Sequence, residues 1–226
     1  MISLIHPSRS RPKDAFAAAN KWIEKAGCKV EYILSCDTDD PLGYQYGAYF
    51  SGKDAIVNNN RSAIDAINNA AKVATGDIFI QMADDFDCPD NWALQIIEAT
   101  KGKTDWILKT QDGIQKWIIT LPIMDRRYYE RFGYIYYPEY QHMFCDTEMS
   151  CVADLTGRKI ISNISFPHNH YSTGKRPKDA ISEKADATWA QGEKLFLERY
   201  KKNFGLIDPP GRITSQEYLN WIKGKL

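Results

Sequence analysis

The chain alternates short apolar runs with stretches in which apolar side chains recur every three or four residues. The short runs have the length of buried strands, and the recurring positions predict amphipathic helices. Strands are expected at Ile2–Ile5, Val30–Leu34 and Asp77–Met82, with helices over Pro12–Ala26 and Arg61–Ala74 between them. Strands that alternate with helices form parallel sheets, so this order predicts an α/β fold with a doubly wound, mostly parallel sheet flanked by helices.

The second half of the chain shows weaker periodicity. Two apolar runs, Trp106–Lys109 and Ile114–Leu121, predict a hairpin, and Lys159–Phe166 predicts a last strand. Residues 35–41 are expected to form a loop, residues 44–53 to be irregular, and Gly76 to end the helix before it. Further helices are expected after Pro89, over residues 147–156, over Ala180–Phe204 and after a capping box at Thr214–Glu217.

Composition fits one folded domain, or one domain with an appendage. The 226 residues have a mass of 25.9 kDa and are 43% hydrophobic, enough to bury a core without disulfides or a structural metal. Basic and acidic side chains number 29 each, so the zero net charge gives no reason to expect a nucleic acid or an anionic membrane as partner. The five cysteines show no Cys-x-x-Cys spacing, which indicates reduced thiols and an intracellular protein. No apolar run is long enough for a signal peptide or a membrane span, so we expect a cytoplasmic protein.

Acidic and polar side chains follow the three predicted strands of the first half. Ligands bind to an open parallel sheet at the carboxyl ends of its strands, so these residues should converge. Clustered carboxylates repel one another unless a cation lies among them, and the pattern therefore predicts a divalent cation with Asp85 and Asp87 as ligands. The alternative is an acidic surface loop that leads into the helix after Pro89. The strand-end residues are His6, Pro7, Ser8, Arg9, Asp37, Asp39, Asp40, Asp84, Asp85 and Asp87.

A five-residue repeat, Arg-Pro-Lys-Asp-Ala, occurs at residues 11–15 and 176–180. Both copies suit a helix start, because Pro fits the first turn and Asp lies near the positive end of the helix dipole. The other interpretation places two basic groups, Arg11-Pro12-Lys13 and Lys175-Arg176, near a phosphate.

Four segments follow one another in an order that is distinctive as a set. They are a strand ending at Pro7, a strand followed by Asp37, the stretch from Asn68 through Ala74-Thr75-Gly76 to Asp84-Asp85, and Phe144-Cys145-Asp146-Thr147-Glu148 followed by Pro167-His168-Asn169-His170. Over about residues 1–175 this set resembles the family-2-like glycosyltransferases with the GT-A fold. Ala83 and Cys145 depart from the family pattern, at the first position of the metal motif and before the catalytic base.

The resemblance implies transfer of a sugar from a nucleoside diphosphate sugar to a hydroxyl acceptor, with inversion at the anomeric carbon. It implies a glycosyltransferase domain over residues 1–175, with a nucleotide-binding half at about 1–100 and an acceptor half at about 101–175, and a C-terminal helical extension over 176–226 packed on the same domain. Asp146 would act as general base, and Mn²⁺ or Mg²⁺ would stabilise the diphosphate leaving group. The implied donor-binding residues are Pro7, Ser8, Arg9, Asp37, Asn68 and Asp84, and the implied metal ligands are Asp85, Asp87, His168 and His170.

Several further candidates have structural alternatives. His168 and His170 alternate on a strand-like segment, so they should face opposite ways, and we expect His168 to be the one that reaches a metal. Glu148 is expected to be an acid on a helix face near its N-terminus, and Asp112-Gly113 a turn. The Tyr- and Arg-rich residues 126–140 either stack on sugar rings or bases, or pack over the sheet.

The sequence leaves the acceptor open among a glycan, a lipid-linked precursor, a protein and a hydroxymethylated base in DNA. A nucleotidyltransferase is a second hypothesis, although no glycine-rich phosphate loop follows the first strand. A non-catalytic nucleotide-sugar-binding domain is a third hypothesis. Such a domain would have lost its base or metal acids, whereas Asp84, Asp85 and Asp146 are all present.

Overall fold

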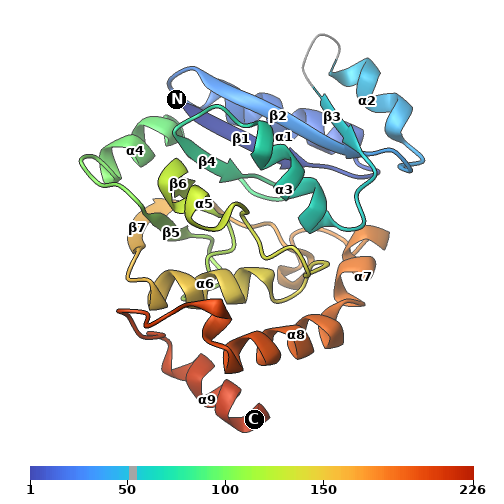
Figure 1. Cartoon of the computed structure of the whole chain (residues 1–226). Helices are drawn as coiled ribbons and strands as arrows, with labels where there is room; N and C mark the ends of the chain where they lie inside the picture. The colour runs from blue at the N-terminus through green and yellow to red at the C-terminus, as the bar shows by residue number, and fades with distance from the viewer. Residues whose placement is uncertain (51–54) are drawn as a thin grey trace.

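Seven strands form one sheet in the order β3-β2-β1-β4-β6-β5-β7 (Figure 1). The computed structural model describes residues 1–50 and 55–226. Neighbouring strands are parallel except where β6 pairs antiparallel with β4 and β5. The predicted mostly parallel sheet is therefore confirmed. The strands are β1 (Ile2–Pro7), β2 (Val30–Asp37), β3 (Ala55–Asn58), β4 (Ile78–Gln81), β5 (Ile107–Gln111), β6 (Ile123–Asp125) and β7 (Lys159–Ser165).

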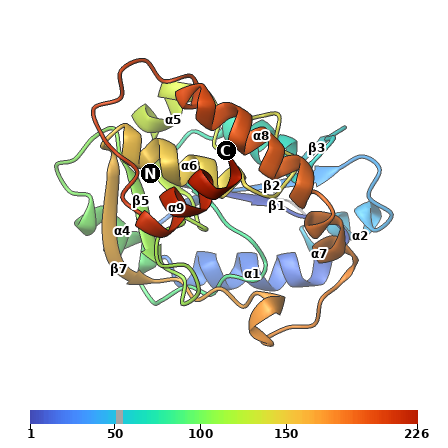
Figure 2. The same ribbon diagram turned by 90° about the horizontal axis from the view of Figure 1, so that it is seen from below.

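Helices cover both faces of this sheet. Figure 2 shows α1 on one side and α3, α6 and α8 on the other. In the described part of the chain, no helix is long and apolar enough to cross a membrane. The helices are α1 (Pro12–Glu24), α2 (Gly43–Tyr49), α3 (Ala63–Val73), α4 (Trp92–Ala99), α5 (Arg126–Phe132), α6 (Cys145–Leu155), α7 (Ala180–Asp186), α8 (Trp189–Lys201) and α9 (Gln216–Lys225), with 3₁₀ turns at Tyr171–Thr173 and Asn203–Gly205.

The two largest hydrophobic clusters among the described residues lie on opposite faces of the sheet. Successive residues of a strand point to opposite faces, so Leu4 packs with α1 and α4 while Ile5 packs with α3 and α6. Ile80 and Phe79 of β4 divide in the same way. Continuous apolar strands are the pattern of a sheet that is buried on both faces, which explains why these runs were readable from the sequence.

Three expected boundaries in the first half are wrong. β2 continues through Asp37 because β3 pairs with its last four residues and satisfies their backbone groups. The stretch expected to be irregular contains α2, while its residues 51–53 lie outside the described residues. α3 ends at Val73, and Gly76 serves a different purpose: a Cβ there would lie 2.8 Å from the carbonyl oxygen of Met1.

The predicted hairpin is also wrong. Residues 114–121 form no strand, and β6 pairs with β5 instead, with Ile107 opposite Met124. The turn at Asp112-Gly113 is confirmed, because Asp112 Oδ1 accepts the backbone N–H groups of Ile114 and Gln115.

The helix predicted over residues 180–204 is divided into α7 and α8. Thr188 lies at the break, where its hydroxyl donates to the carbonyl of Ala185 and accepts the N–H of Met143. The last helix is capped by Ser215 rather than by Thr214, whose hydroxyl donates to Asp154 at 2.6 Å. Phe196 of α8 and Ile222 of α9 lie in the same core as α3 and α6, so these C-terminal helices pack on the sheet-bearing body.

A buried ion pair attaches α8 to α6. Glu148 is 3% exposed, and both its carboxylate oxygens accept from Arg199 Nε at 2.8–2.9 Å. The hydroxyl of Tyr140 also donates to Glu148 at 2.8 Å. Burial raises the pKa of Glu148, against the lowering effect of Arg199. Glu148 lies in the first turn of α6, as expected, and its carboxylate joins this helix to α8.

Arg199→Met should lower the free energy of unfolding by about 3–5 kcal/mol, because it leaves the Glu148 carboxylate buried without its cation. Urea denaturation measures this change. The double variant Glu148→Gln/Arg199→Met should recover most of the loss, since no unpaired charge remains. Equal losses in the single and double variants would show that the packing of the arginine stem, and not the ion pair, holds α8.

Candidate functional site

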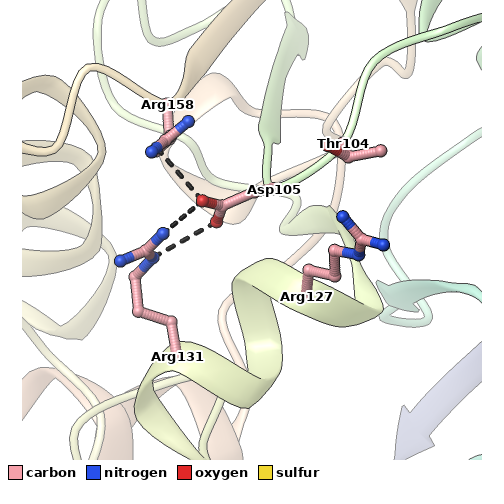
Figure 3. Close-up of a pocket in the computed structure, with 5 residues that line it drawn as sticks. All are labelled: Thr104, Asp105, Arg127, Arg131 and Arg158. Carbon is pink, nitrogen blue, oxygen red and sulfur yellow. Dashed lines mark hydrogen bonds and ion pairs between the residues drawn. The ribbon is translucent and has the colours of Figure 1, made fainter.

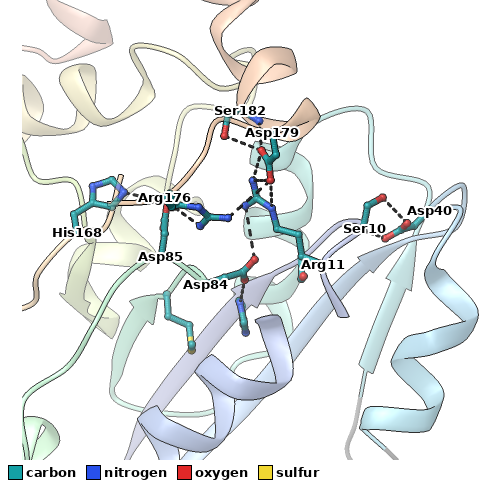
Figure 4. Close-up of polar contacts among 12 residues, drawn as sticks. Ser10, Arg11, Asp40, Asp84, Asp85, His168, Arg176, Asp179 and Ser182 are labelled. Carbon is teal, nitrogen blue, oxygen red and sulfur yellow. Dashed lines mark hydrogen bonds and ion pairs between the residues drawn. The ribbon is translucent and has the colours of Figure 1, made fainter. Parts of the chain in front are cut away.

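The loop after β4 meets the segment after β7, although two strands separate β4 from β7 in the sheet. The N–H of Asn169 donates to the carbonyl of Asp85 at 2.7 Å, and the rings of Phe86 and His168 stack with centroids 4.0 Å apart. These contacts bring His168 Nε2 to 3.3 Å from Asp85 Oδ2 (Figure 4). Two of the predicted metal ligands, Asp85 and His168, are therefore neighbours.

Asp84 is held by a histidine that the sequence placed only at the end of the first strand. His6 is fully buried, and its Nε2 lies 2.7 Å from Asp84 Oδ1 while its Nδ1 lies 2.8 Å from the hydroxyl of Tyr32. The other oxygen of Asp84 is 3.7 Å from Arg11 Nη1. A carboxylate with partners on both oxygens keeps one orientation, so Asp84 is fixed toward the strand end.

Two arginines from the two copies of the repeat meet at this edge of the sheet. Arg11 donates from both Nε and Nη2 to the carboxylate of Asp179, at the N-cap of α7, at 2.5–2.8 Å. Arg176 lies 3.8 Å from Asp179 and 3.7 Å from Asp85 (Figure 4). The segment before α7 thereby covers the acidic loop. The helix-start interpretation is confirmed, because residues 12–15 open α1 and Asp179 is the N-cap of α7. The phosphate interpretation stays a prediction, although the two arginines do flank the strand-end acids.

The electrostatics of these acids follow from their partners. Burial alone would raise the pKa of Asp85, but the hydrogen bond from His168 and the charge of Arg176 lower it overall. Burial likewise opposes the ionised form of Asp179, yet hydrogen bonds from Ser182 and Arg11 lower its pKa to about 2. Both carboxylates are thus ionised at neutral pH, and the positive charges needed to balance them come from the chain itself.

A second group of predicted residues lies at the ends of β1 and β2. Arg9 donates to Asp37 Oδ2 at 2.7 Å and to both carboxylate oxygens of Asp39. The other oxygen of Asp37 accepts from Asn60 at 2.8 Å. Ser8, which follows Pro7 at the end of β1, shares a hydrogen bond with the hydroxyl of Tyr46 at 2.7 Å. The hydroxyl of Tyr46 also accepts the backbone N–H of Arg11 at 3.3 Å, which connects Ser8 to the start of α1.

Asp146 lies in the first turn of α6, one residue after the helix begins. Burial raises its pKa, although its own neighbour Thr147 donates a backbone hydrogen bond at 2.7 Å. The charge of His168 is near enough to favour the ionised form of Asp146. The predicted base is thus in electrostatic range of the predicted metal site, and a carboxylate with a raised pKa is a stronger proton acceptor.

Solved structures of similar shape were found, whereas no protein-family model and no curated protein sequence matches the chain. One is the mannosyltransferase PcManGT from Pyrobaculum calidifontis in complex with GDP-Man and Mn²⁺, which is 12% identical with a TM-score of 0.57 over 74% of this chain and 56% of that one. Another is glucosyl-3-phosphoglycerate synthase from Mycobacterium tuberculosis with Mn²⁺, UDP and phosphoglyceric acid, which is 12% identical with a TM-score of 0.57 over 83% and 76%. The chain has the GT-A fold.

TarS residues 1–349 from S. aureus, in complex with UDP, has the same TM-score of 0.57 at 14% identity, over 73% of this chain and 59% of that one. The present chain therefore spans less than two thirds of the length of PcManGT and of this TarS fragment. In this chain the loops after β1, β2 and β4 lie along one edge of the sheet. The acids and arginines described above lie at that edge (Figure 4).

Several predicted residues lie apart from this cluster. The carboxylate of Asp87 lies 2.6 Å from Lys21 Nζ and accepts the N–H of Cys88, so it does not join Asp85. Asn68 is buried. Its amide nitrogen donates to the carbonyl of Tyr136, and its amide oxygen accepts the N–H groups of Ile135 and Tyr136. Among the described residues no group of three metal-binding side chains is preassembled.

His168 and His170 do not face opposite ways. Their ring centroids are 5.1 Å apart, because regular strand geometry ends at Ser165 and only an isolated bridge to Phe86 follows. The expected alternation is therefore wrong. His170 uses Nδ1 to contact the hydroxyl of Ser172 at 2.7 Å, which leaves its Nε2 without a contact in the described structure.

The sequence reasoning missed His142, which precedes α6. The side chain of His142 is exposed, and the charges of Asp85, Asp186 and His170 reach it. Neither a motif nor a periodic pattern marks this residue. The aromatic residues of 126–140 were left between two interpretations, and the packing interpretation holds for Tyr128, Tyr136 and Tyr140, which are all buried.

Proposed function

We propose that this protein is a metal-dependent, inverting glycosyltransferase that moves a sugar from a nucleoside diphosphate sugar to a hydroxyl acceptor. The observation that carries the proposal is the cluster of Asp84, Asp85, His168, Arg11 and Arg176 at the carboxyl edge of a GT-A sheet. The similar structures of PcManGT and of TarS contain GDP-Man and UDP respectively, which supports a nucleotide-sugar as donor.

Asp85 and His168 suit a divalent cation by chemistry and position. A carboxylate oxygen and an imidazole nitrogen 3.3 Å apart form a mixed donor pair of the kind that accepts Mn²⁺, with the His170 ring beside them. A cation held there would supply Lewis-acid stabilisation of the charge that develops on the diphosphate. Asp85 and His168 would supply two ligands to the cation, and the phosphates of the donor would supply others.

Arg11 and Arg176 are proposed to bind the diphosphate directly. Guanidinium groups bind phosphate oxygens through two parallel hydrogen bonds. Arg11 now uses this capacity on Asp179, whereas Arg176 forms only longer ion pairs, with Asp85 at 3.7 Å and with Asp179 at 3.8 Å. Exchange of these carboxylate partners for phosphate oxygens would keep the arginine charges compensated. Arg9 and Asp37 are proposed to line the nucleoside end of the same site, with Pro7 and Ser8 beneath them.

Asp146 is proposed to accept the proton of the acceptor hydroxyl as that oxygen attacks the anomeric carbon. Attack from the side opposite the leaving diphosphate inverts the configuration. The raised pKa of Asp146 suits this role, provided that the carboxyl is ionised at the working pH. Tyr128, Tyr136 and Tyr140 are buried, so these tyrosines do not support stacking on a base in DNA.

Thermal unfolding with UDP, GDP, CDP and TDP, each with Mn²⁺, Mg²⁺ or EDTA, tests the proposal. A nucleotide at about one hundred times its Kd stabilises the native state by about 2.7 kcal/mol, which for a chain of this length raises Tm by about 5–10 °C. We expect one nucleotide to produce this shift with metal and a smaller one with EDTA. No shift with any pair would contradict a nucleotide-sugar donor and favour a domain with a different ligand.

A further inference from the structure

An arginine-lined pocket lies at the end of the sheet opposite the proposed donor site. It has a volume of about 560 Å³ and is lined by Thr104, Asp105, Arg127, Arg131 and Arg158. Asp105 and Arg158 precede the first residues of β5 and β7, whereas His168 follows the last residue of β7. The seven residues of β7 span about 20 Å, so this pocket is separate from the cluster around Asp85.

The charges that line the pocket do not balance. Arg131 and Arg158 both pair with Asp105, the latter at 3.2 Å, while Arg127 has no ion pair or hydrogen bond within the described ranges 1–50 and 55–226 (Figure 3). Two guanidinium groups thus face the carboxylate of Asp105 and that of Arg127 lies apart from it, so the residues that line the pocket carry two net positive charges. Arg127 and Arg131 are also four residues apart on α5, a spacing at which like charges destabilise a helix.

Hydrogen bonds hold together the backbone segments that carry these side chains. The carboxylate of Asp125 accepts the N–H groups of Asp105, at 2.6 Å, and Trp106, at 3.1 Å, and it also caps α5 through Tyr128 at 2.9 Å. One carboxylate therefore fixes the start of β5 relative to the helix that carries Arg127 and Arg131. Arg158 is fixed by its carbonyl, which accepts the N–H of Ile107.

We propose that this pocket binds a phosphomonoester dianion carried on a small molecule. Two uncompensated guanidinium charges match a dianion, and the planar fork of Arg fits phosphate oxygens through paired hydrogen bonds. The hydroxyl of Thr104 adds a further donor at the rim. The volume exceeds that of a phosphate group alone, so it admits the phosphate together with part of its carrier.

Calorimetric titration of the full chain in EDTA, with inorganic phosphate and with glucose 6-phosphate, tests this site. Arg127→Gln should weaken both affinities at least about tenfold, because one charge-assisted contact is lost. The change breaks no hydrogen bond or ion pair among the described residues. Arg61→Gln is the matched control, since Arg61 is an exposed arginine that pairs with Asp65 at the start of α3. Its phosphate affinity should equal that of the wild type.

The variant Arg11→Gln distinguishes phosphate binding at this pocket from binding at the proposed donor site. We expect Arg11→Gln to keep phosphate binding at the pocket and Arg127→Gln to keep metal-dependent nucleotide binding. Phosphate binding that is unchanged in Arg127→Gln, or lost in Arg11→Gln, would overturn the proposal without bearing on the glycosyltransferase function. Binding of a short single-stranded oligonucleotide but of neither phosphate monoester would also overturn it.

Discussion

Asp85→Asn should abolish the metal-dependent part of nucleotide binding while the chain stays folded. The substitution keeps the size of the side chain but removes the charge that faces His168 and Arg176. A neutral amide is a poor ligand for a divalent cation, and without the cation the diphosphate charge is met only by the arginines. The Mn²⁺-dependent rise in Tm, about 5–10 °C at saturating nucleotide, should therefore vanish.

Asp87→Asn is the matched control for this experiment. It removes the same charge from the same loop, two residues later, but from a carboxylate that contacts Lys21 rather than Asp85. We expect Asp87→Asn to keep the Mn²⁺-dependent shift. A loss in both variants would restore Asp87 as a metal ligand, and retention in both would show that the cation binds elsewhere. Unfolding without ligand reports any damage to the fold.

Asp146→Asn should leave nucleotide binding intact and remove sugar transfer. The asparagine cannot accept the proton of the acceptor hydroxyl, and loss of a general base costs about 10²–10⁴-fold in rate. The nucleotide-dependent rise in Tm should not change, because Asp146 contacts none of the residues proposed to hold the diphosphate. Transfer at near-normal rate in Asp146→Asn would show that another group takes the proton.

The pH dependence of transfer gives a second readout of the same residue. Burial raises the pKa of Asp146, and the base acts only when it is ionised. The transfer rate should therefore fall as the pH drops through this raised pKa, at a higher pH than for an exposed aspartate of pKa about 3.9. An acid limb at the ordinary aspartate value would contradict the assignment, as would a wild-type rate that is independent of pH.

The positions of the acids were predictable because strand ends are a local property of the chain. Apolar runs mark the strands that are buried on both faces, and the parallel order then places Asp37, Asp84 and Asp85 at one edge. Asp87 shows where this reasoning stops. Asp87 is two residues from Asp85 in sequence, which suggests a shared metal. The chain turns at residues 84–85, and the side chain of Asp87 pairs with Lys21 on α1.

The partners of those acids were not predictable, because they come from distant parts of the chain. Arg11 and Asp179 are separated by 168 positions, and His6 and Asp84 by 78. No periodic pattern links such residues. The repeat at 11–15 and 176–180 was the available signal, but neither of its two interpretations, shared helix starts or basic residues near a phosphate, predicted that Arg11 would pair with Asp179.

The sequence alone determined the strands β1, β2 and β4, the helices α1 and α3, the buried faces of the sheet and the acidic strand end after β4. These follow from side-chain period and turn chemistry, which act over a few residues. Tertiary structure alone decided that β6 runs antiparallel, that His168 faces Asp85 and that Arg11 and Arg176 flank the acids. Strand order and long-range ion pairs depend on how complete elements pack, and the free energy of that packing belongs to no single segment of the chain.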